Sequence, residues 1–341
     1  MVQAAFYEGN EQIRIGECIP VQPAAGEVQI KVSHCGICGT DLHLFHGKMD
    51  HRVHLPQVFG HEMSGTITAL GEGVKGFALG DRVTVRPLDP CGTCAACLAG
   101  HSHICYHLKF IGIDAPGALQ GLWTVPAHTL HRLPDSLSFK LGALIEPLAV
   151  ASHDVRLAEV ARGEHIVVQG GGPIGVLIGL VARSAGAKVL LSEVNPFRLQ
   201  LAGELGFETV NPRQTDLAGY VNAWTNSAGA DVVFEVSGSA AGAEMMTKLP
   251  RTRGRIVIVA IFGEVPRVNL FQFFWRELRL LGARVYEPQD FESAISLASS
   301  GTLPLERLIS KVTPLDGLEA ALRQLESGGE VMKILVQCSQ D

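Results

Sequence analysis

Residues 165–175 read His-Ile-Val-Val-Gln-Gly-Gly-Gly-Pro-Ile-Gly, and this stretch decides the fold of the second half of the chain. Its short apolar run predicts a buried strand, its glycines a tight turn, and its proline the first turn of a helix. Glu193 ends the next predicted strand, 21 positions after Gly172. This order predicts a turn that binds the pyrophosphate of a dinucleotide at a helix N-terminus. A glycine-rich turn that serves packing alone is the alternative.

The acidic residue indicates which dinucleotide this turn takes. A carboxylate at Glu193 can accept hydrogen bonds from the adenosine ribose hydroxyls, and it would repel a 2′-phosphate. The sequence therefore favours NAD over NADP, although Arg198 lies close enough in sequence to soften that repulsion.

Two secondary-structure patterns divide the chain. From about residue 150 onward, short apolar runs alternate with helix-length segments, which predicts a parallel sheet built from βαβ units, with strands at 165–169, 188–192, 230–235, 254–259 and 278–282. The first 150 residues favour an irregular β domain, with strands at 28–32, 65–70 and 81–85. The C-terminal part predicts helices at 291–299 and 315–327 and a last strand at 332–336.

Composition narrows the possible partners. The 341 residues include 47% hydrophobic and 18% charged side chains and have a formal net charge of −6, without a basic block. Such a chain can bury a large core, and it lacks the cationic surface that nucleic acid or an anionic membrane requires. The first residues show no secretory signal, and the apolar stretch 166–182 is broken by Gln169, glycines and Pro173. We expect a cytoplasmic protein that acts on a small molecule.

Four cysteines form the most specific motif, at positions 91, 94, 97 and 105. Two-residue gaps let successive thiolates turn toward one ion, and the longer gap closes a tetrahedral shell. A complete shell leaves no position for a substrate, so this pattern predicts a structural zinc site. Two disulfides and an iron–sulfur cluster are the alternatives.

A second set of metal ligands is spread along the chain. Cys38 lies in Gly-Ile-Cys-Gly-Thr-Asp, His61 and Glu62 lie in Gly-His-Glu, and Glu146 follows much later. Each residue alone is more often a packing or surface residue. Together they offer one sulfur, one nitrogen and two oxygen donors, which suits a zinc site with an open position for an alcohol or carbonyl oxygen.

These motifs together resemble the zinc-dependent medium-chain dehydrogenase/reductase family, which includes alcohol, sorbitol and threonine dehydrogenases. The resemblance covers essentially the whole chain and includes a Gly-His-Glu motif matched by Gly60, His61, Glu62, Gly65, Gly71 and Val74. It implies an α/β protein with a GroES-like β-rich catalytic domain, residues 1–148 with 285–341. A Rossmann NAD-binding domain, residues 149–284, is inserted in it, and the active site lies in the cleft between the domains.

The family pattern also implies roles for individual residues. Cys38, His61 and Glu62 would hold the catalytic zinc, with Glu146 in or just behind the ligand shell, and Cys91, Cys94, Cys97 and Cys105 would hold a second, structural zinc. Thr40 and His43 match the family's proton relay: the Thr40 hydroxyl takes the alcohol's proton, which leaves through the nicotinamide ribose and His43.

The same resemblance extends the cofactor site beyond the glycine turn. Ile174 would pack under the cofactor, Arg198 would reach its adenosine end, and segments 259–261 and 283–285 would cover the nicotinamide. The cofactor residues implied are Gly170, Gly172, Pro173, Ile174, Gly175, Glu193, Arg198, Val259, Ile261, Ala283 and Val285.

Two departures from the family pattern bear on the substrate. Polyol dehydrogenases usually carry Tyr six residues after the zinc cysteine and Arg near the second covering segment, whereas this chain has Leu44 and Val285. These departures disfavour sorbitol itself, and we expect the substrate to be a secondary alcohol of a polyol, sugar, sugar acid or cyclitol. L-Threonine 3-dehydrogenase-type oxidation of an aminoalcohol is the alternative. The resemblance also implies a homodimer or homotetramer, joined through the sheet edge near 278–285.

Two non-catalytic functions are alternatives to a dehydrogenase. A non-catalytic dinucleotide-binding relative predicts loss of the metal set, yet Cys38, His61 and Glu62 are intact. A zinc-storage or zinc-sensing role leaves Glu193 and the glycine turn unexplained. The remaining histidines that follow closely, 46, 51 and 54, receive no metal role. Among the remaining cysteines, Cys18 and Cys35 are expected in strands or core, and Cys338 as a tail thiol.

Overall fold

The computed structural model describes residues 1–339 and divides into two compact units. The first combines Met1–Glu146 with the segment from Glu287 onward, and the second comprises Pro147–Tyr286. The limits of the inserted domain expected from the sequence, 149 and 284, lie two residues inside those of the second unit.

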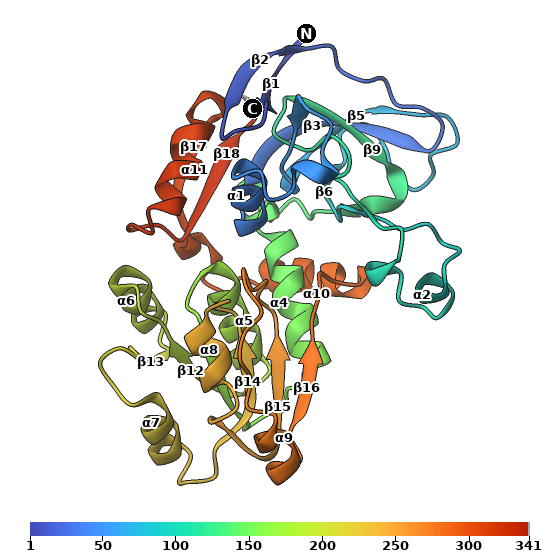
Figure 1. Ribbon diagram of the computed structural model, residues 1–341. Helices are drawn as coiled ribbons and strands as arrows, with labels where there is room; N and C mark the ends of the chain where they lie inside the picture. Colours follow the sequence, from blue (N-terminus) through green and yellow to red (C-terminus); the bar gives the residue numbers. More distant parts are fainter. Residues whose placement is uncertain (340–341) are drawn as a thin grey trace. The chain divides into compact units, whose positions relative to one another are not determined.

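A six-stranded parallel sheet forms the second unit (Figure 1). Its strand order is β13-β12-β11-β14-β15-β16, which places the glycine-turn strand β11 in the middle. Since all pairs run parallel, the carboxyl ends of the strands meet at one edge of the sheet. The bounds are β11 His165–Gln169, β12 Lys188–Ser192, β13 Glu208–Val210, β14 Ala230–Glu235, β15 Pro250–Ile258 and β16 Arg279–Gly282.

Apolar side chains explain how helices pack on this sheet. Helix α5 begins at Pro173, directly after the glycine turn, and each of its residues from 175 to 182 is buried. A core that includes Val167, Leu190 and Val233 is fully buried between strands and helices. The bounds of the helices are α4 Ile145–Leu157, α5 Pro173–Ser184, α6 Pro196–Glu204, α7 Leu217–Trp224, α8 Ala240–Met245 and α9 Phe271–Arg276.

The first unit is built on a mainly antiparallel sheet with the order β10-β6-β5-β3-β18-β17, in which β9 pairs with β3 and β17 runs parallel to β18. A second sheet has the order β2-β1-β4, and β7 pairs with β8. The strands are β1 Val2–Tyr7, β2 Ile13–Cys18, β3 Glu27–Gly36, β4 Gln57–Val58, β5 Glu62–Leu70, β6 Arg82–Val85, β7 Leu88–Asp89, β8 Lys109–Phe110, β9 Leu122–Pro126, β10 Leu130–Arg132, β17 Ile309–Pro314 and β18 Lys333–Gln337. The helices are α1 Gly39–Phe45, α2 Ala95–Leu98, α3 Phe139–Gly142, α10 Pro288–Ser299 and α11 Leu318–Glu326.

The α/β fold class expected from the sequence is confirmed, as is the parallel sheet. The C-terminal strand β18 lies between β3 and β17, so the two ends of the chain share one sheet. Within residues 1–339, no helix combines the length and apolar character needed to cross a membrane.

Candidate functional site

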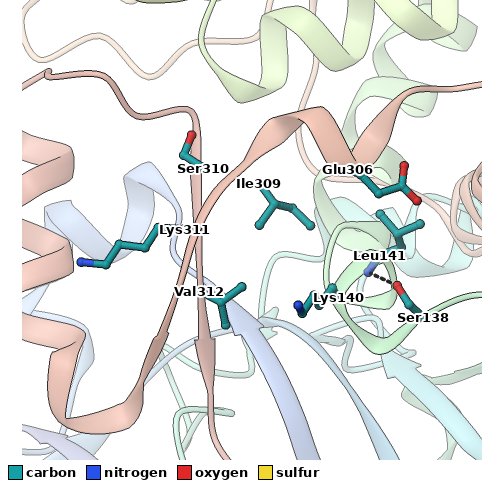
Figure 2. Close-up of a pocket in the computed structure, with 8 residues that line it drawn as sticks. All are labelled: Ser138, Lys140, Leu141, Glu306, Ile309, Ser310, Lys311 and Val312. Carbon is teal, nitrogen blue, oxygen red and sulfur yellow. Dashed lines mark hydrogen bonds between the residues drawn. The ribbon is translucent and has the colours of Figure 1, made fainter.

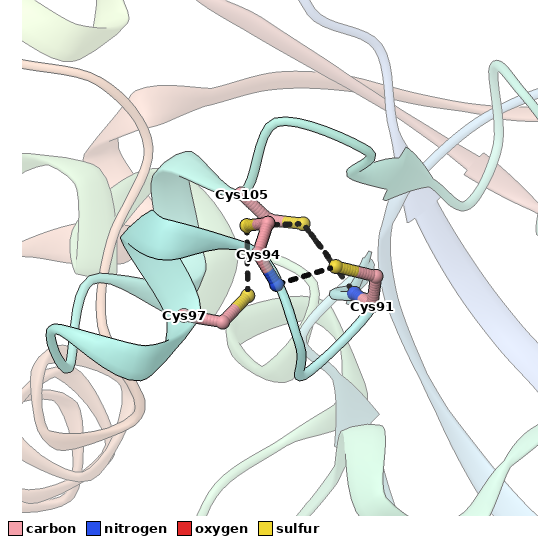
Figure 3. A group of neighbouring side chains, drawn as sticks. All are labelled: Cys91, Cys94, Cys97 and Cys105. Carbon is pink, nitrogen blue, oxygen red and sulfur yellow. Dashed lines mark hydrogen bonds between the residues drawn. The ribbon is translucent and has the colours of Figure 1, made fainter.

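The cysteine motif folds into a compact cluster of four sulfurs (Figure 3). The Sγ–Sγ distances are 3.5 Å for Cys94–Cys97, 3.7 Å for Cys94–Cys105 and 3.5 Å for Cys91–Cys105. Four sulfurs about 2.3 Å from one ion lie roughly 3.8 Å apart at the corners of a tetrahedron. The cluster therefore fits a single tetrahedral metal ion, and all four residues are free cysteines rather than disulfides.

Backbone amides around this cluster favour the thiolate form of Cys91. The N–H groups of Cys94 and His107 donate to the sulfurs of Cys91 and Cys105, at 3.4 and 3.3 Å. Hydrogen bonds from the backbone of Thr93 and Cys94 lower the pKa of Cys91 to about 6. Thiolate is the form that binds a metal, so the loop offers at least one ligand already near its binding state.

Cys38 is positioned by the start of helix α1. It is the N-cap residue, and its sulfur accepts a hydrogen bond from the Thr40 N–H at 3.1 Å. The Asp41 carboxylate accepts from the Cys38 N–H at 2.9 Å, which completes a capping box. The short motif around Cys38 thus fixes the thiol at a defined point between β3 and α1.

His61 is buried beside Cys38 and Asp41. Its Nδ1 has no hydrogen-bond partner among the described residues and lies 3.5 Å from the Asp41 carboxylate. Burial acts to lower the pKa of His61, but the charges of Cys38 and Asp41 outweigh it and raise the pKa well above the usual value. An imidazole oriented by a carboxylate at one nitrogen presents the other to a metal, so the arrangement fits a ligand better than a packing histidine.

Glu62 begins strand β5, where it pairs with Gly36 of β3. A Cβ at position 36 would lie 2.2 Å from the Glu62 carboxylate, so this position requires glycine. Both carboxylate oxygens accept from the ammonium of Lys333, at 2.7 and 2.5 Å. Burial acts to lower the pKa of Lys333, but the charges of Glu62 and Cys38 outweigh burial, so the pKa of Lys333 is raised.

Glu146 completes the candidate metal centre from the first turn of helix α4. Ligand atoms of His61, Glu62 and Glu146 lie within 4.8 Å of one another, and the same limit holds for Cys38, Asp41 and His61. His61 therefore joins a thiol-bearing group to a carboxylate-bearing group, and all these residues except the half-buried Cys38 are buried. One sulfur, one imidazole and two carboxylates are a donor set suited to zinc.

The two residues expected to relay the proton lie on α1. Thr40 and His43 are three positions apart, which places them on one face of the helix. Burial, with the charges of Lys48 and His46, lowers the pKa of His43, so the imidazole is neutral near pH 7. Leu44, at the position where polyol dehydrogenases usually carry tyrosine, is a buried core residue.

The glycine turn has the geometry that its motif predicts. Gly170 has φ +108°, and a Cβ at Gly175 would lie 1.9 Å from the Gly170 carbonyl oxygen. Gly172 is the N-cap of α5 and Pro173 its first residue, while Ile174 is half-buried. Amide groups at the start of α5 are therefore available to an anionic ligand.

Glu193 is held by three backbone amides beside this turn. Its carboxylate accepts from Gly171 at 2.7 Å, Val194 at 2.6 Å and Asn195 at 2.8 Å. A Cβ at Gly172 would lie 3.7 Å from a terminal nitrogen of Arg198, whose buried Nε has no partner among the described residues. The structure thus brings a fixed carboxylate and an arginine close to the turn.

The two segments expected to cover the nicotinamide, 259–261 and 283–285, follow the carboxyl ends of β15 and β16. The Val259 N–H donates to the Glu235 carbonyl at 3.0 Å, and the Ala283 N–H to the Ile258 carbonyl at 2.9 Å. Ile261 is 69% exposed, and Val285 has φ +50°, a conformation that costs a β-branched residue energy. Such strain is typical of functional loops.

Asp41 and Lys333 were missed by the sequence analysis. The spacing of Cys38 and Asp41 is a capping-box signal, and Lys333 is a lone cation in an otherwise apolar strand. Cys18 and Cys35 lie in strands β2 and β3, as expected. The interpretation of Cys338 as a tail thiol is wrong: its backbone N–H bonds to Ser33, and its side chain is buried.

A separate pocket of about 370 Å³ lies in the first unit, where its lining includes Ser138, Lys140, Glu306 and Lys311 (Figure 2). It contains none of the residues expected at the metal or cofactor sites. Figure 2 shows the Lys311 side chain directed away from the others, so the pocket is no cluster of converging cations.

Family models match both halves of the chain. Residues 24–135 match the alcohol dehydrogenase GroES-like domain, and residues 173–300 match the zinc-binding dehydrogenase model. The fold and site define the class as a metal-dependent oxidoreductase with a GroES-like and a Rossmann domain. The chain belongs to the zinc-dependent medium-chain dehydrogenase/reductase family.

Three similar proteins illustrate this membership. The chain is 53% identical to 2-dehydro-3-deoxy-L-galactonate 5-dehydrogenase of Pseudoalteromonas atlantica, over 99% of both chains. It is 33% identical to sorbitol dehydrogenase of Halalkalibacterium halodurans, over 92% of both chains. A Sinorhizobium meliloti structure assigned as a zinc-binding dehydrogenase and bound to NADP has a TM-score of 0.92 and 34% identity, over 99% of both chains.

Proposed function

We propose that this enzyme oxidises a secondary alcohol of a sugar acid or polyol with NAD, or reduces the corresponding ketone. The observation that carries the proposal is the assembly of Cys38, His61, Glu62 and Glu146 at one buried centre of the first unit. Three separate segments of the sequence supply these donors, and their chemistry suits an open zinc site.

The protein's own groups would hold and orient the components of the reaction. Cys38 and His61, with the carboxylates of Glu62 and Glu146, would hold the catalytic zinc, and Asp41 would orient His61. When bound, zinc polarises the substrate oxygen and lowers the pKa of an alcohol, and the nicotinamide accepts the hydride. The four-cysteine cluster would hold a second, structural zinc.

Proton removal falls to helix α1. The Thr40 hydroxyl would accept the proton of the substrate alcohol, and the neutral imidazole of His43, on the same face, would accept it in turn. A lowered pKa suits His43 for this role because the ring can release the proton to solvent near neutral pH.

The substrate class is supported by the similarity to a sugar acid dehydrogenase at 53% identity. Leu44 lies in the core at the position where polyol dehydrogenases usually carry tyrosine, and this departure disfavours sorbitol as the substrate. A ketodeoxy sugar acid therefore ranks before sorbitol, and L-threonine remains the second candidate within the same chemistry.

A substrate screen tests this proposal. The zinc-loaded enzyme would be assayed for NADH formation with aldonates, ketodeoxy sugar acids, pentitols, hexitols, cyclitols and L-threonine. We expect turnover with at least one sugar acid or polyol and a much lower kcat/KM with L-threonine. Activity confined to threonine, or absent across the panel in both reaction directions, would contradict the proposed substrate class.

Cofactor choice provides the next prediction. Because three amides fix Glu193 beside the turn, its negative charge faces an incoming 2′-phosphate. We expect Glu193→Ala to shift the ratio of kcat/KM values toward NADP at least tenfold, equivalent to about 1.4 kcal/mol. Glu204→Ala, which removes an exposed carboxylate from α6, should leave the ratio unchanged. An unaltered ratio in Glu193→Ala would refute the role of this residue.

We also propose a homodimer or a larger homo-oligomer joined through β16. This strand ends the sheet order, so its outer edge has no neighbouring strand among residues 1–339. Exposed apolar side chains lie close by, with Phe271, Phe274 and Trp275 at 59, 77 and 69% exposure. An unpaired edge beside an apolar patch fits a two-fold contact with a second copy.

Sedimentation velocity tests this association. Trp275→Glu should raise the dimer dissociation constant at least a hundredfold, because it places a charge in the apolar patch. Leu98→Glu, at another exposed apolar position (78% exposed), serves as the control and should sediment as the parent does. A Trp275→Glu protein with the parent's sedimentation coefficient at all concentrations would contradict this interface.

We also propose that the protein is cytoplasmic. We propose further that each chain holds two zinc ions. All eight cysteines are free thiols, including the four that form the cluster. Free thiols at this density suit a reducing compartment, where they serve metal binding rather than disulfides.

A further inference from the structure

Lys333 is a buried cation beside the candidate metal centre. Its side chain is 3% exposed, and its ammonium donates to both oxygens of Glu62, at 2.7 and 2.5 Å, and to the Ile37 carbonyl at 3.0 Å. It comes from β18, which pairs with β3, whereas Glu62 begins β5 on the other side of β3. The fold therefore pairs a fully buried lysine with a carboxylate that lies among the candidate metal ligands.

The chemistry around Lys333 is acidic. Glu62, Glu146 and His61 place ligand atoms within 4.8 Å of one another, and Cys38 and Asp41 group with His61 at the same limit. Carboxylates buried close together repel one another unless a cation offsets them. A metal ion supplies one such cation, and the ammonium of Lys333 supplies another that is part of the chain.

We propose that Lys333 is a positioning residue that acts as the resident counter-ion of Glu62 and competes with the metal ion for this carboxylate. In the metal-free protein, Lys333 holds the Glu62 carboxylate at the metal centre. Once metal is bound, Lys333 weakens the electrostatic attraction between Glu62 and the metal ion. This role rests on the proposed metal site and adds to it a residue that tunes metal affinity without contact with substrate.

The net charge of the Lys333–Glu62 pair predicts whether each substitution strengthens or weakens metal binding. In the parent, the ammonium of Lys333 neutralises the charge of Glu62 and so offsets part of the attraction between this carboxylate and the metal. Lys333→Met leaves a negative pair and should strengthen metal binding, whereas Glu62→Gln leaves a positive pair and should weaken it. The double variant Lys333→Met/Glu62→Gln is neutral again and, although it lacks the Glu62 carboxylate, should bind metal more tightly than Glu62→Gln alone.

Cobalt titration measures these affinities. Full-length protein that retains zinc in its cysteine cluster would be titrated with Co²⁺ against a competing chelator, and visible d–d absorption would report the Cys38 site. We expect Lys333→Met to bind at least tenfold tighter than the parent, Glu62→Gln at least tenfold weaker, and the double variant at least threefold tighter than Glu62→Gln. Lys311→Met, which removes an exposed lysine from the neighbouring strand β17, is the matched control and should not change affinity.

The pattern of signs separates this proposal from a purely structural role. If Lys333 only maintained packing, every variant would bind cobalt more weakly, and that result would overturn the counter-ion role. Should Lys333→Met fail to fold, the comparison of Glu62→Gln with the double variant still decides, because the second substitution must restore affinity. A parent protein that binds no cobalt at this centre would instead refute the proposed metal site.

Discussion

Cys38→Ser is expected to lower kcat at least a thousandfold. Cys38 supplies the sulfur of the candidate metal centre, and serine is a poor substitute because its hydroxyl keeps its proton near neutral pH. Loss of Lewis-acid catalysis removes several kcal/mol of transition-state stabilisation, and each 1.4 kcal/mol is about a tenfold change in rate. Steady-state kinetics on the substrate found by the screen would measure the loss, and metal analysis should show zinc falling from two ions to one per chain.

Two further measurements on Cys38→Ser separate a catalytic role from a folding defect. NADH affinity should remain within threefold of the parent, because the glycine turn and Glu193 belong to the other unit. The matched control is Cys18→Ser, which alters a half-buried thiol in β2 outside both cysteine-containing clusters. If Cys38→Ser kept full activity, the assignment of the catalytic metal centre would be wrong.

Cys97→Ser is expected to unfold the cysteine loop and lower thermal stability. Between residues 91 and 105, only Ala96, His103 and Cys105 are buried, so the loop lacks a core of its own. Its helix α2 spans four residues, and Leu98 is 78% exposed. A loop of this kind depends on its metal for structure, since bound zinc contributes folding free energy directly.

We expect Tm to fall by at least about 5 °C, which corresponds to roughly 2 kcal/mol for a domain of this size. Differential scanning calorimetry measures this shift, and limited proteolysis should show new cleavage between residues 91 and 105. A chelator strong enough to strip all zinc should produce the same cleavage in the parent. Cys97→Ser with the parent's Tm and an uncut loop would show that the cluster is not a structural metal site.

The sequence alone predicted one of the two metal sites more completely than the other. The four cysteines lie within fifteen residues, so local backbone geometry brings their sulfurs together, and the spacing alone predicted the cluster. Cys38, His61 and Glu146 are far apart in sequence, and their proximity depends on β3, β5 and the start of α4. Donor chemistry and the resemblance to a family suggested that they form one site, but neither gave the distances between them.

The ion pair of Lys333 could not be predicted from sequence patterns. A lone lysine in an apolar strand gives no indication of its partner, because the partner belongs to a strand far away in sequence. The pairing of β18 with β3 brings the ammonium to Glu62. Gly36 was likewise unremarkable until the structure placed the Glu62 carboxylate where a Cβ would lie.

The amino-acid sequence by itself determined the parallel sheet, the glycine turn with Glu193 and the four-cysteine loop, because each depends on periodicity or spacing among residues close together in the chain. The tertiary structure alone decided that Asp41 lies beside His61 and that Lys333 pairs with Glu62. Those contacts join segments whose separation in sequence carries no distance information. Burial then makes them matter, since charges removed from water must find their partners inside the fold.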